Sequence, residues 1–166
     1  MMDTTVERAV NEQIGHELES AYLYLAMSAH FESASFPGFA SWMRLQAREE
    51  LDHAMRLFDH VHGRGGRVAL QALGKPPVKF GTPLEIFEAA LAHERKITGL
   101  IHALHETAGR KKDAATQVFL QWFITEQVEE EQGASAAVEQ LRMAGGAPAA
   151  LLMLDAKFGA RSEAGR

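Results

Sequence analysis

The sequence predicts an all-α protein, a four-helix bundle made of two antiparallel hairpins. A long crossover joins the second and third helices, and a short fifth helix follows at the carboxyl end. Three observations predict this fold. Apolar residues recur every three or four positions through four long segments. Glycine and proline cluster in four breaks between them. The 166 residues suffice for one domain with a sizeable core.

Thr4 is expected to be the N-cap of the first helix, with Glu7 at the spacing of a capping box. From Val6, apolar residues follow in steps of three or four as far as Leu25. The break at residues 35–38 separates this helix from the second, which extends to the glycine-rich break at residues 63–66. Because the first break is short, we expect these two helices to be antiparallel neighbours.

The connection between the second and third helices covers residues 66–82 and has no period of its own. Its 17 residues can span about 56 Å when extended. A helix of about 25 residues is only about 38 Å long. The connection can therefore run the full length of the bundle, which predicts that the second and third helices are parallel.

Thr82 is expected to be the N-cap of the third helix, with Pro83 and Glu85 at the N1 and N3 positions. The fourth follows a tight break at residues 109–113, and the fifth covers about residues 148–158. We therefore expect one domain over residues 1–166, with the bundle at about 4–144. Leucines and a phenylalanine form the expected apolar face of the fifth helix, and three internal glycines are expected at close helix contacts. These residues are Leu151, Leu152, Leu154 and Phe158, and Gly15, Gly99 and Gly133.

Composition excludes several classes of function. The chain has 17 Lys and Arg against 22 Asp and Glu, a net charge of −5, which disfavours nucleic-acid binding. It has no cysteine, which excludes disulfides, thiolate zinc sites and iron–sulfur clusters. The amino terminus does not resemble a secretory signal, and no apolar stretch is long enough to span a membrane. We therefore expect a cytoplasmic protein.

Polar residues interrupt the inward-facing stripe of each long helix at matched positions. The first helix has Glu17, and the second has Glu50 and His53, one turn apart. Glu94 lies in the third helix, and the fourth repeats the spacing. Glu50 and His53 follow Glu17 by 33 and 36 residues; Gln127 and Glu130 follow Glu94 by the same intervals. Residues equidistant from a hairpin turn lie level, so these side chains are expected to meet at one depth.

The charges predict what this polar layer binds. Four buried glutamates would carry a charge of −4, which is too costly without compensation. Two divalent cations would neutralise them. Oxygen donors with one imidazole suit iron or manganese, and carboxylates from four helices form the di-metal site of such bundles. Tyr24 continues the stripe of the first helix, where its phenol could donate a hydrogen bond or one electron to the metal pair.

The chain resembles the bacterial non-haem ferritins over essentially its whole length. The resemblance rests on Glu17, Tyr24, the run Glu49-Glu50-x-x-His53, Glu94, and the run Glu126-Gln127-x-Glu129-Glu130. It implies a ferroxidase that takes Fe²⁺ and O₂ as substrates and stores ferric mineral inside a hollow homo-oligomeric shell of 24 subunits. No haem is implied, because Asp52 stands where the haem-binding bacterioferritins have methionine.

The resemblance also implies ligand sets. The first iron would bind Glu17, Glu50 and His53. The second would bind Glu50, Glu94 and Glu130, with Gln127 close by. A third, weaker site would use the carboxylates of Glu49, Glu126, Glu129 and Glu130.

Two other functions stay open on the residues alone. One is a small di-metal oxidase that uses iron or manganese on an organic substrate, and it would not form a large particle. The other is a non-catalytic scaffold whose carboxylates only bind cations. Asp113 and Gln117 are candidates for the lining of a pore between subunits.

Overall fold

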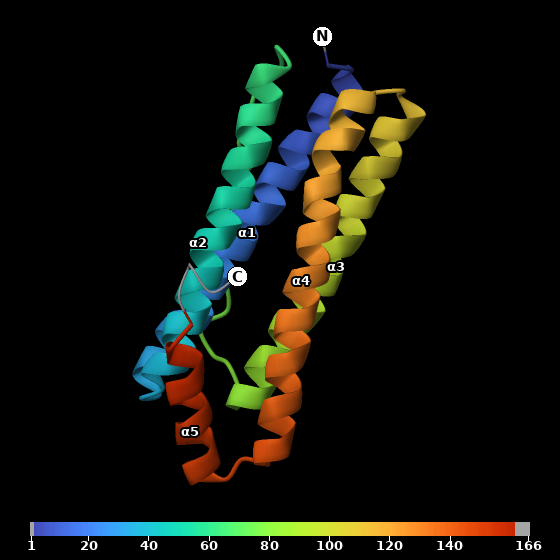
Figure 1. Cartoon of the computed structure of the whole chain (residues 1–166). Coiled ribbons are helices and arrows are strands. Elements are labelled where there is room, and N and C mark those ends of the chain that lie inside the picture. Colours follow the sequence, from blue (N-terminus) through green and yellow to red (C-terminus); the bar gives the residue numbers. More distant parts are fainter. Residues whose placement is uncertain (1, 162–166) are drawn as a thin grey trace.

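The computed structural model describes residues 2–161, and this part of the chain forms five α-helices and no strand (Figure 1). They are α1 (Thr4–Ser33), α2 (Pro37–Gly63), α3 (Pro83–Arg110), α4 (Ala114–Ala144) and α5 (Pro148–Gly159). The predicted four-helix bundle with a short fifth helix is confirmed. No helix in residues 2–161 combines the length and the apolar character needed to cross a membrane.

The turns of the two hairpins have the same backbone geometry. Ser35 and Lys112 adopt left-handed conformations, with φ of 61° and 57°. In both turns the next amide nitrogen donates to the carbonyl oxygen five residues earlier, at 2.9 Å. This bonding ends a helix and reverses the chain within three residues. Equal turns place equivalent residues at equal distances from the turn of their own hairpin. Because the two turns lie at opposite ends of the bundle, equivalent residues of the two hairpins come level only near its middle (Figure 1).

The crossover returns along the whole bundle, so α2 and α3 run in the same direction, as predicted (Figure 1). Asn11 of α1 anchors its beginning through both ends of its side-chain amide. Its Nδ2 donates to the carbonyl oxygen of Arg67 at 3.0 Å, and its Oδ1 accepts from the amide of Ala69 at 2.7 Å. The crossover is thereby attached to the first hairpin.

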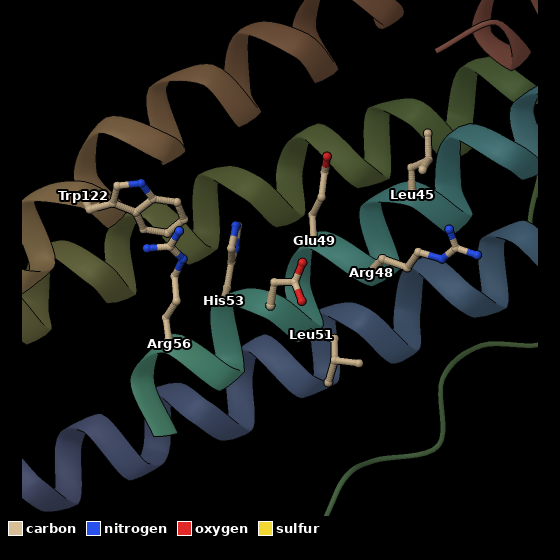
Figure 2. A pocket seen from close by; sticks show the side chains of 8 residues that line it. Leu45, Arg48, Glu49, Leu51, His53, Arg56 and Trp122 are labelled. Carbon is tan, nitrogen blue, oxygen red and sulfur yellow. The ribbon is translucent and has the colours of Figure 1, made fainter. Parts of the chain in front are cut away.

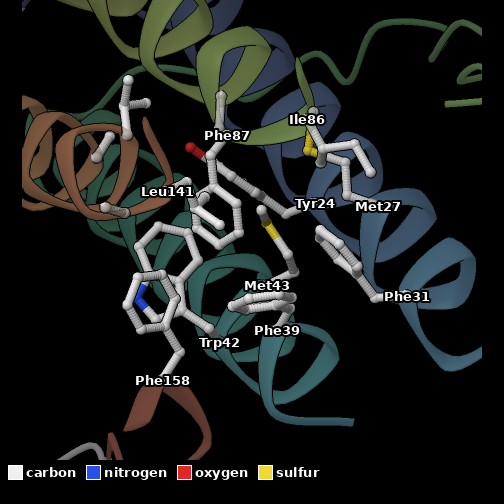
Figure 3. Packing of buried hydrophobic residues seen from close by; sticks show 14 of the residues in the cluster. Tyr24, Met27, Phe31, Phe39, Trp42, Met43, Ile86, Phe87, Leu141 and Phe158 are labelled. Carbon is white, nitrogen blue, oxygen red and sulfur yellow. The ribbon is translucent and has the colours of Figure 1, made fainter. Parts of the chain in front are cut away.

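Two apolar clusters fill the bundle on either side of the polar layer. The cluster near α5 is aromatic: Phe39 packs against Phe31, Phe87 and Phe158 with ring centroids 5.3 to 5.6 Å apart (Figure 3). The cluster at the opposite end is mostly aliphatic. Its fully buried members include Val6, Val10, Leu57, Val61, Ile101 and Leu120.

Helix α5 packs on the beginning of α2 through backbone contact. A Cβ atom at Gly38 would lie 1.7 Å from the carbonyl oxygen of Asp155, and one at Gly159 would lie 2.8 Å from the Gly38 Cα. The buried Asp155 side chain also accepts a hydrogen bond from the amide of Phe39 at 2.8 Å. It therefore satisfies a donor at the first turn of α2, which lacks a side-chain cap of its own.

Three local expectations need correction. The N-cap of α1 is Asp3, whose carboxylate accepts from the amides of the first turn, and Thr4 is the first helical residue. Two of the three internal glycines, Gly99 and Gly133, have no described neighbour within 4 Å of a built Cβ, so they are not close contacts. Leu152 is 60% exposed and lies off the buried face of α5. The capping box at Thr82 is confirmed.

Candidate metal centre

The polar layer lies at the middle of the bundle, and each long helix contributes to it. All six matched side chains are buried, with exposed fractions from 1% for Glu17, Glu50 and Glu94 to 7% for Glu130. The hairpin spacing thus brings them to one depth, as the sequence predicted. These groups are Glu17, Glu50, His53, Glu94, Gln127 and Glu130.

Glu17, Glu50 and His53 form the tighter part of the layer. Each offers a ligand atom within 4.8 Å of the other two. His53 Nδ1 lies 3.2 Å from Glu50 Oε2 and 4.0 Å from Glu17 Oε2. Among the described residues, Glu17 Oε2 and Glu50 Oε1 are fully buried and have no hydrogen-bond partner. Buried carboxylate oxygens without donors are costly unless a cation binds them.

Glu94 is held by hydrogen-bond donors from α1 and α4. Tyr24 donates from its hydroxyl to Glu94 Oε1. Gln127 Nε2 lies 3.3 Å from Glu94 Oε2 and the same distance from the Glu94 carbonyl oxygen. The Gln127 amide therefore faces Glu94 with its nitrogen. In this arrangement Gln127 supports a carboxylate.

A second metal-binding group joins α2 and α4. His53, Glu126 and Glu130 offer ligand atoms within 4.8 Å of one another, and His53 Nε2 lies 4.0 Å from Glu126 Oε1. Gln46 Nε2 donates to Glu130 Oε2 at 2.7 Å. The two nitrogens of the His53 ring thus face different carboxylate groups.

Burial sets the protonation of the centre. It raises the pKa of Glu17, Glu50 and Glu94 above the ordinary value, and neighbouring carboxylates add to the rise. Burial and the charge of Glu94 raise the pKa of Glu130 to about 7. Burial beside Glu94 also raises the pKa of Tyr24, which keeps its phenol protonated as a donor. The donor set therefore fits hard divalent cations, which would replace protons on these oxygens.

Two cavities reach the centre. One of about 410 Å³ is lined by His53, Glu49 and Asp52, with Arg56 stacked 3.9 Å from the ring centroid of Trp122 (Figure 2). Another of about 260 Å³ is lined by carboxylates of α4 and by a cation. Its polar lining is Gln46, Glu126, Glu129, Glu130 and Arg161.

The remaining predicted residues have different surroundings. Glu49 is half-buried and ion-paired with Arg161 at 3.0 Å, while Glu129 is exposed. Asp113 is the N-cap of α4 and accepts from Arg64 at 2.8 Å. Its place in a pore, and that of Gln117, stays a prediction.

Sequence reasoning missed three supporting residues. Gln13 donates to Glu17 Oε1 at 2.8 Å, Gln46 donates to Glu130, and Arg161 binds Glu49. The two glutamines lie four residues before Glu17 and Glu50, which places each on the same helix face as a site carboxylate. That spacing was an available signal. For Arg161 no comparable signal exists.

A four-helix bundle whose middle holds buried carboxylates and an imidazole defines a metal-binding carboxylate protein. Comparison with known proteins narrows this class. The family model of the ferritin-like domain matches residues 7–144. Bacterial non-heme ferritins are 42% identical in Bacteroides fragilis, over 97% of this chain and 100% of that protein, and 34% identical in Staphylococcus aureus, over 98% of each.

Solved structures also indicate the ferritin family. An open-pore ferritin from the archaeon Archaeoglobus fulgidus superposes with a TM-score of 0.96 at 47% identity, covering 98% of this chain and 100% of that one. The chain belongs to the ferritin family. Its function is ferritin iron storage, and the buried carboxylates and histidine supply the residues of a ferroxidase centre.

Proposed function

We propose that the centre binds two Fe²⁺ ions as a substrate pair. Glu17, Glu50 and His53 hold the first ion. Glu50, Glu94 and Glu130 hold the second, so that Glu50 lies between the two. The observation that carries this proposal is the pair of buried, unpartnered oxygens on Glu17 and Glu50. Burial, and after it the charge of Glu94, raises the pKa of both Glu50 and Glu130, and the closeness of these three carboxylates supports the second position.

The residues of the centre then have distinct tasks. A pair of ferrous ions can supply both electrons that reduce O₂ to the level of hydrogen peroxide, which avoids a one-electron oxygen radical. The carboxylates favour Fe³⁺ over Fe²⁺ because they are hard anionic donors. His53 fixes the geometry of the first position. Tyr24 and Gln127 orient Glu94, so we assign Tyr24 a positioning role through that carboxylate.

A third, weaker cation position is proposed at the carboxylates on the cavity side of the centre, Glu49, Glu126, Glu129 and Glu130. The grouping of His53, Glu126 and Glu130, and the cavity of about 260 Å³ beside them, support it. This position would accept ions that pass between the pair and the stored mineral.

We also propose that the whole chain, with α5, is one subunit of a 24-subunit shell that encloses the ferric mineral. An exposed apolar groove on α1, α2 and the crossover supports subunit contacts there. Its lining includes Tyr22, Leu25, Leu51 and Leu73, which are 42% to 50% exposed. On a sizing column, 24 chains of 18.3 kDa should elute near 440 kDa; elution as a monomer or dimer would contradict the shell.

The catalytic proposal is tested by mixing the assembled protein with two Fe²⁺ per chain in air and following the ferric absorbance. Glu17→Ala and His53→Ala should slow the fast phase by roughly 100-fold or more, because ligand loss exceeds the effect of losing a supporting partner. Glu12→Ala and His102→Ala are matched controls, since both residues are exposed on α1 and α3. A fast phase of normal rate in Glu17→Ala would contradict the assignment.

A further inference from the structure

Arg161 lies two residues beyond α5 and is held by three side chains of α2. Its Nη2 lies 3.1 and 3.0 Å from the two carboxylate oxygens of Glu49. Its Nη1 donates to Gln46 Oε1 at 2.5 Å. The guanidinium also lies 5.0 Å from the ring centroid of Trp42. The carboxyl end of the fold thus places a fixed positive charge beside the centre.

This charge borders the cavity that the carboxylates of α4 line. Glu126, Glu129 and Glu130 share that cavity with Arg161. Glu49 completes the proposed third cation position, and both of its oxygens lie within hydrogen-bond distance of the guanidinium. A metal ion that uses Glu49 therefore competes with Arg161 for these oxygens.

We propose that Arg161 is the resident cation of the third carboxylate set, and that a metal ion binds there only in competition with it. The inference rests on the proposed function and adds a regulation of the same site. It makes the third position weaker than the pair at Glu17 and Glu50, where no arginine or lysine side chain is hydrogen-bonded to either carboxylate in the described residues.

The ion pair between Arg161 and Glu49 can compete with a metal ion because it is partly shielded from water. The side chains of Arg161 and Glu49 are 24% and 15% exposed, whereas fully exposed ion pairs contribute little. Arg161 also fixes Gln46, whose amide donates to Glu130. Departure of Arg161 would remove a charged partner from Glu49 and a contact that holds Gln46, the donor to Glu130.

The test measures binding of Zn²⁺, which is redox-inert, to the assembled full-length protein by equilibrium dialysis. In Arg161→Gln, the third Zn²⁺ per chain should bind on the order of tenfold tighter, because one charge-assisted hydrogen-bonded contact no longer opposes it. The first two Zn²⁺ should bind as before. Arg142→Gln is the matched control, since this arginine pairs with Glu88 and Glu139 on the surface.

A second readout follows Arg161 itself. With Trp122→Phe as background, Trp42 is the only indole of the chain, and its emission should change when the third Zn²⁺ displaces the guanidinium. The change should be absent when Arg161→Gln is added. Arg161→Lys keeps the charge but not both contacts, so it should give an intermediate affinity and serves if the glutamine variant fails to assemble.

The outcomes separate the two proposals. If the unaltered protein and Arg161→Gln bind the third Zn²⁺ with equal affinity, or if Arg161→Gln shows no third binding step, the role of Arg161 is overturned. The proposed metal pair would be unaffected by either result. If the unaltered protein does not show the first two Zn²⁺ binding steps, the proposed metal pair is overturned, and this inference with it.

Discussion

The two hairpins of the bundle share a backbone plan and differ in what they supply to the centre. From Val6 onward, residues of α1–α2 have an equivalent 77 positions later in α3–α4: Ser35 matches Lys112 at the turn, and Glu17 matches Glu94. The supporting residues do not repeat. Tyr24 corresponds to Ile101, Gln13 to Ala90 and Gln46 to Phe123. The repeated turns set the depth of the site, while the unmatched residues set its asymmetry.

As a consequence, the carboxylates of the two hairpins differ in their hydrogen-bond partners. On the first hairpin, Glu17 and Glu50 each keep one oxygen without a partner among the described residues. On the second hairpin, Glu94 receives donors from Tyr24 and Gln127, and Glu130 receives one from Gln46. We therefore expect the first metal position to form at Glu17, Glu50 and His53.

The largest expected effect concerns packing at equivalent positions. Phe87 is the equivalent of Val10, and both are fully buried. Phe87→Ala should lower the free energy of unfolding by about 3–5 kcal/mol, and Val10→Ala by only about 2 kcal/mol, since it removes two methyl groups. Denaturant unfolding checks both. If both substitutions lower the free energy of unfolding equally, the aromatic and aliphatic clusters contribute alike, which would contradict the expected difference between them.

The next effect concerns Tyr24, a hydrogen-bond donor of the first hairpin that has no counterpart in the second. Tyr24→Phe removes the donor to Glu94 and should weaken the second metal position about tenfold, with a similar loss in the rate of Fe²⁺ oxidation. The first position should keep its affinity. Anaerobic Fe²⁺ titration separates the two steps, and equal weakening of both would contradict a role through Glu94.

The smallest effect is a pH dependence that belongs to the second hairpin, which has Glu130 where the first has His53. The pKa of Glu130 is raised from 4.5 to about 7 by burial and by Glu94. The folded metal-free protein therefore binds an extra proton between these values. That contribution to stability is complete below pH 4.5 and is lost as the pH rises through about 7.

Glu130→Gln should reduce this slope by up to about 1.4 kcal/mol per pH unit between pH 5 and 7. Unfolding by denaturant in the presence of a chelator measures it. The control is Glu139→Gln, an exposed carboxylate on the same helix. An unchanged slope in Glu130→Gln would mean that this carboxyl titrates normally.

Much of the molecule follows from local spacing and some of it does not. The helices and the depth of the six central side chains were predictable because helix period and distance from a turn are properties of the sequence itself. The partners of those side chains were not. Gln46 precedes Glu50 by one turn yet donates to Glu130, and Glu126, which was expected only at the third site, groups with His53. Such choices depend on rotamers and on how the hairpins face each other.

Arg161 was beyond prediction for a further reason, because its position depends on how α5 crosses α2. The backbones meet at Gly38 and Gly159, where a side chain on either residue would collide with the other helix. This contact fixes the position of the last turn of α5, and therefore that of Arg161, relative to α2. One residue inserted between Gly159 and Arg161 in helical geometry would turn the arginine by about 100° and move it about 1.5 Å along the axis. Lengthening the chain at this point would therefore separate Arg161 from Glu49 even with every side chain of the centre intact.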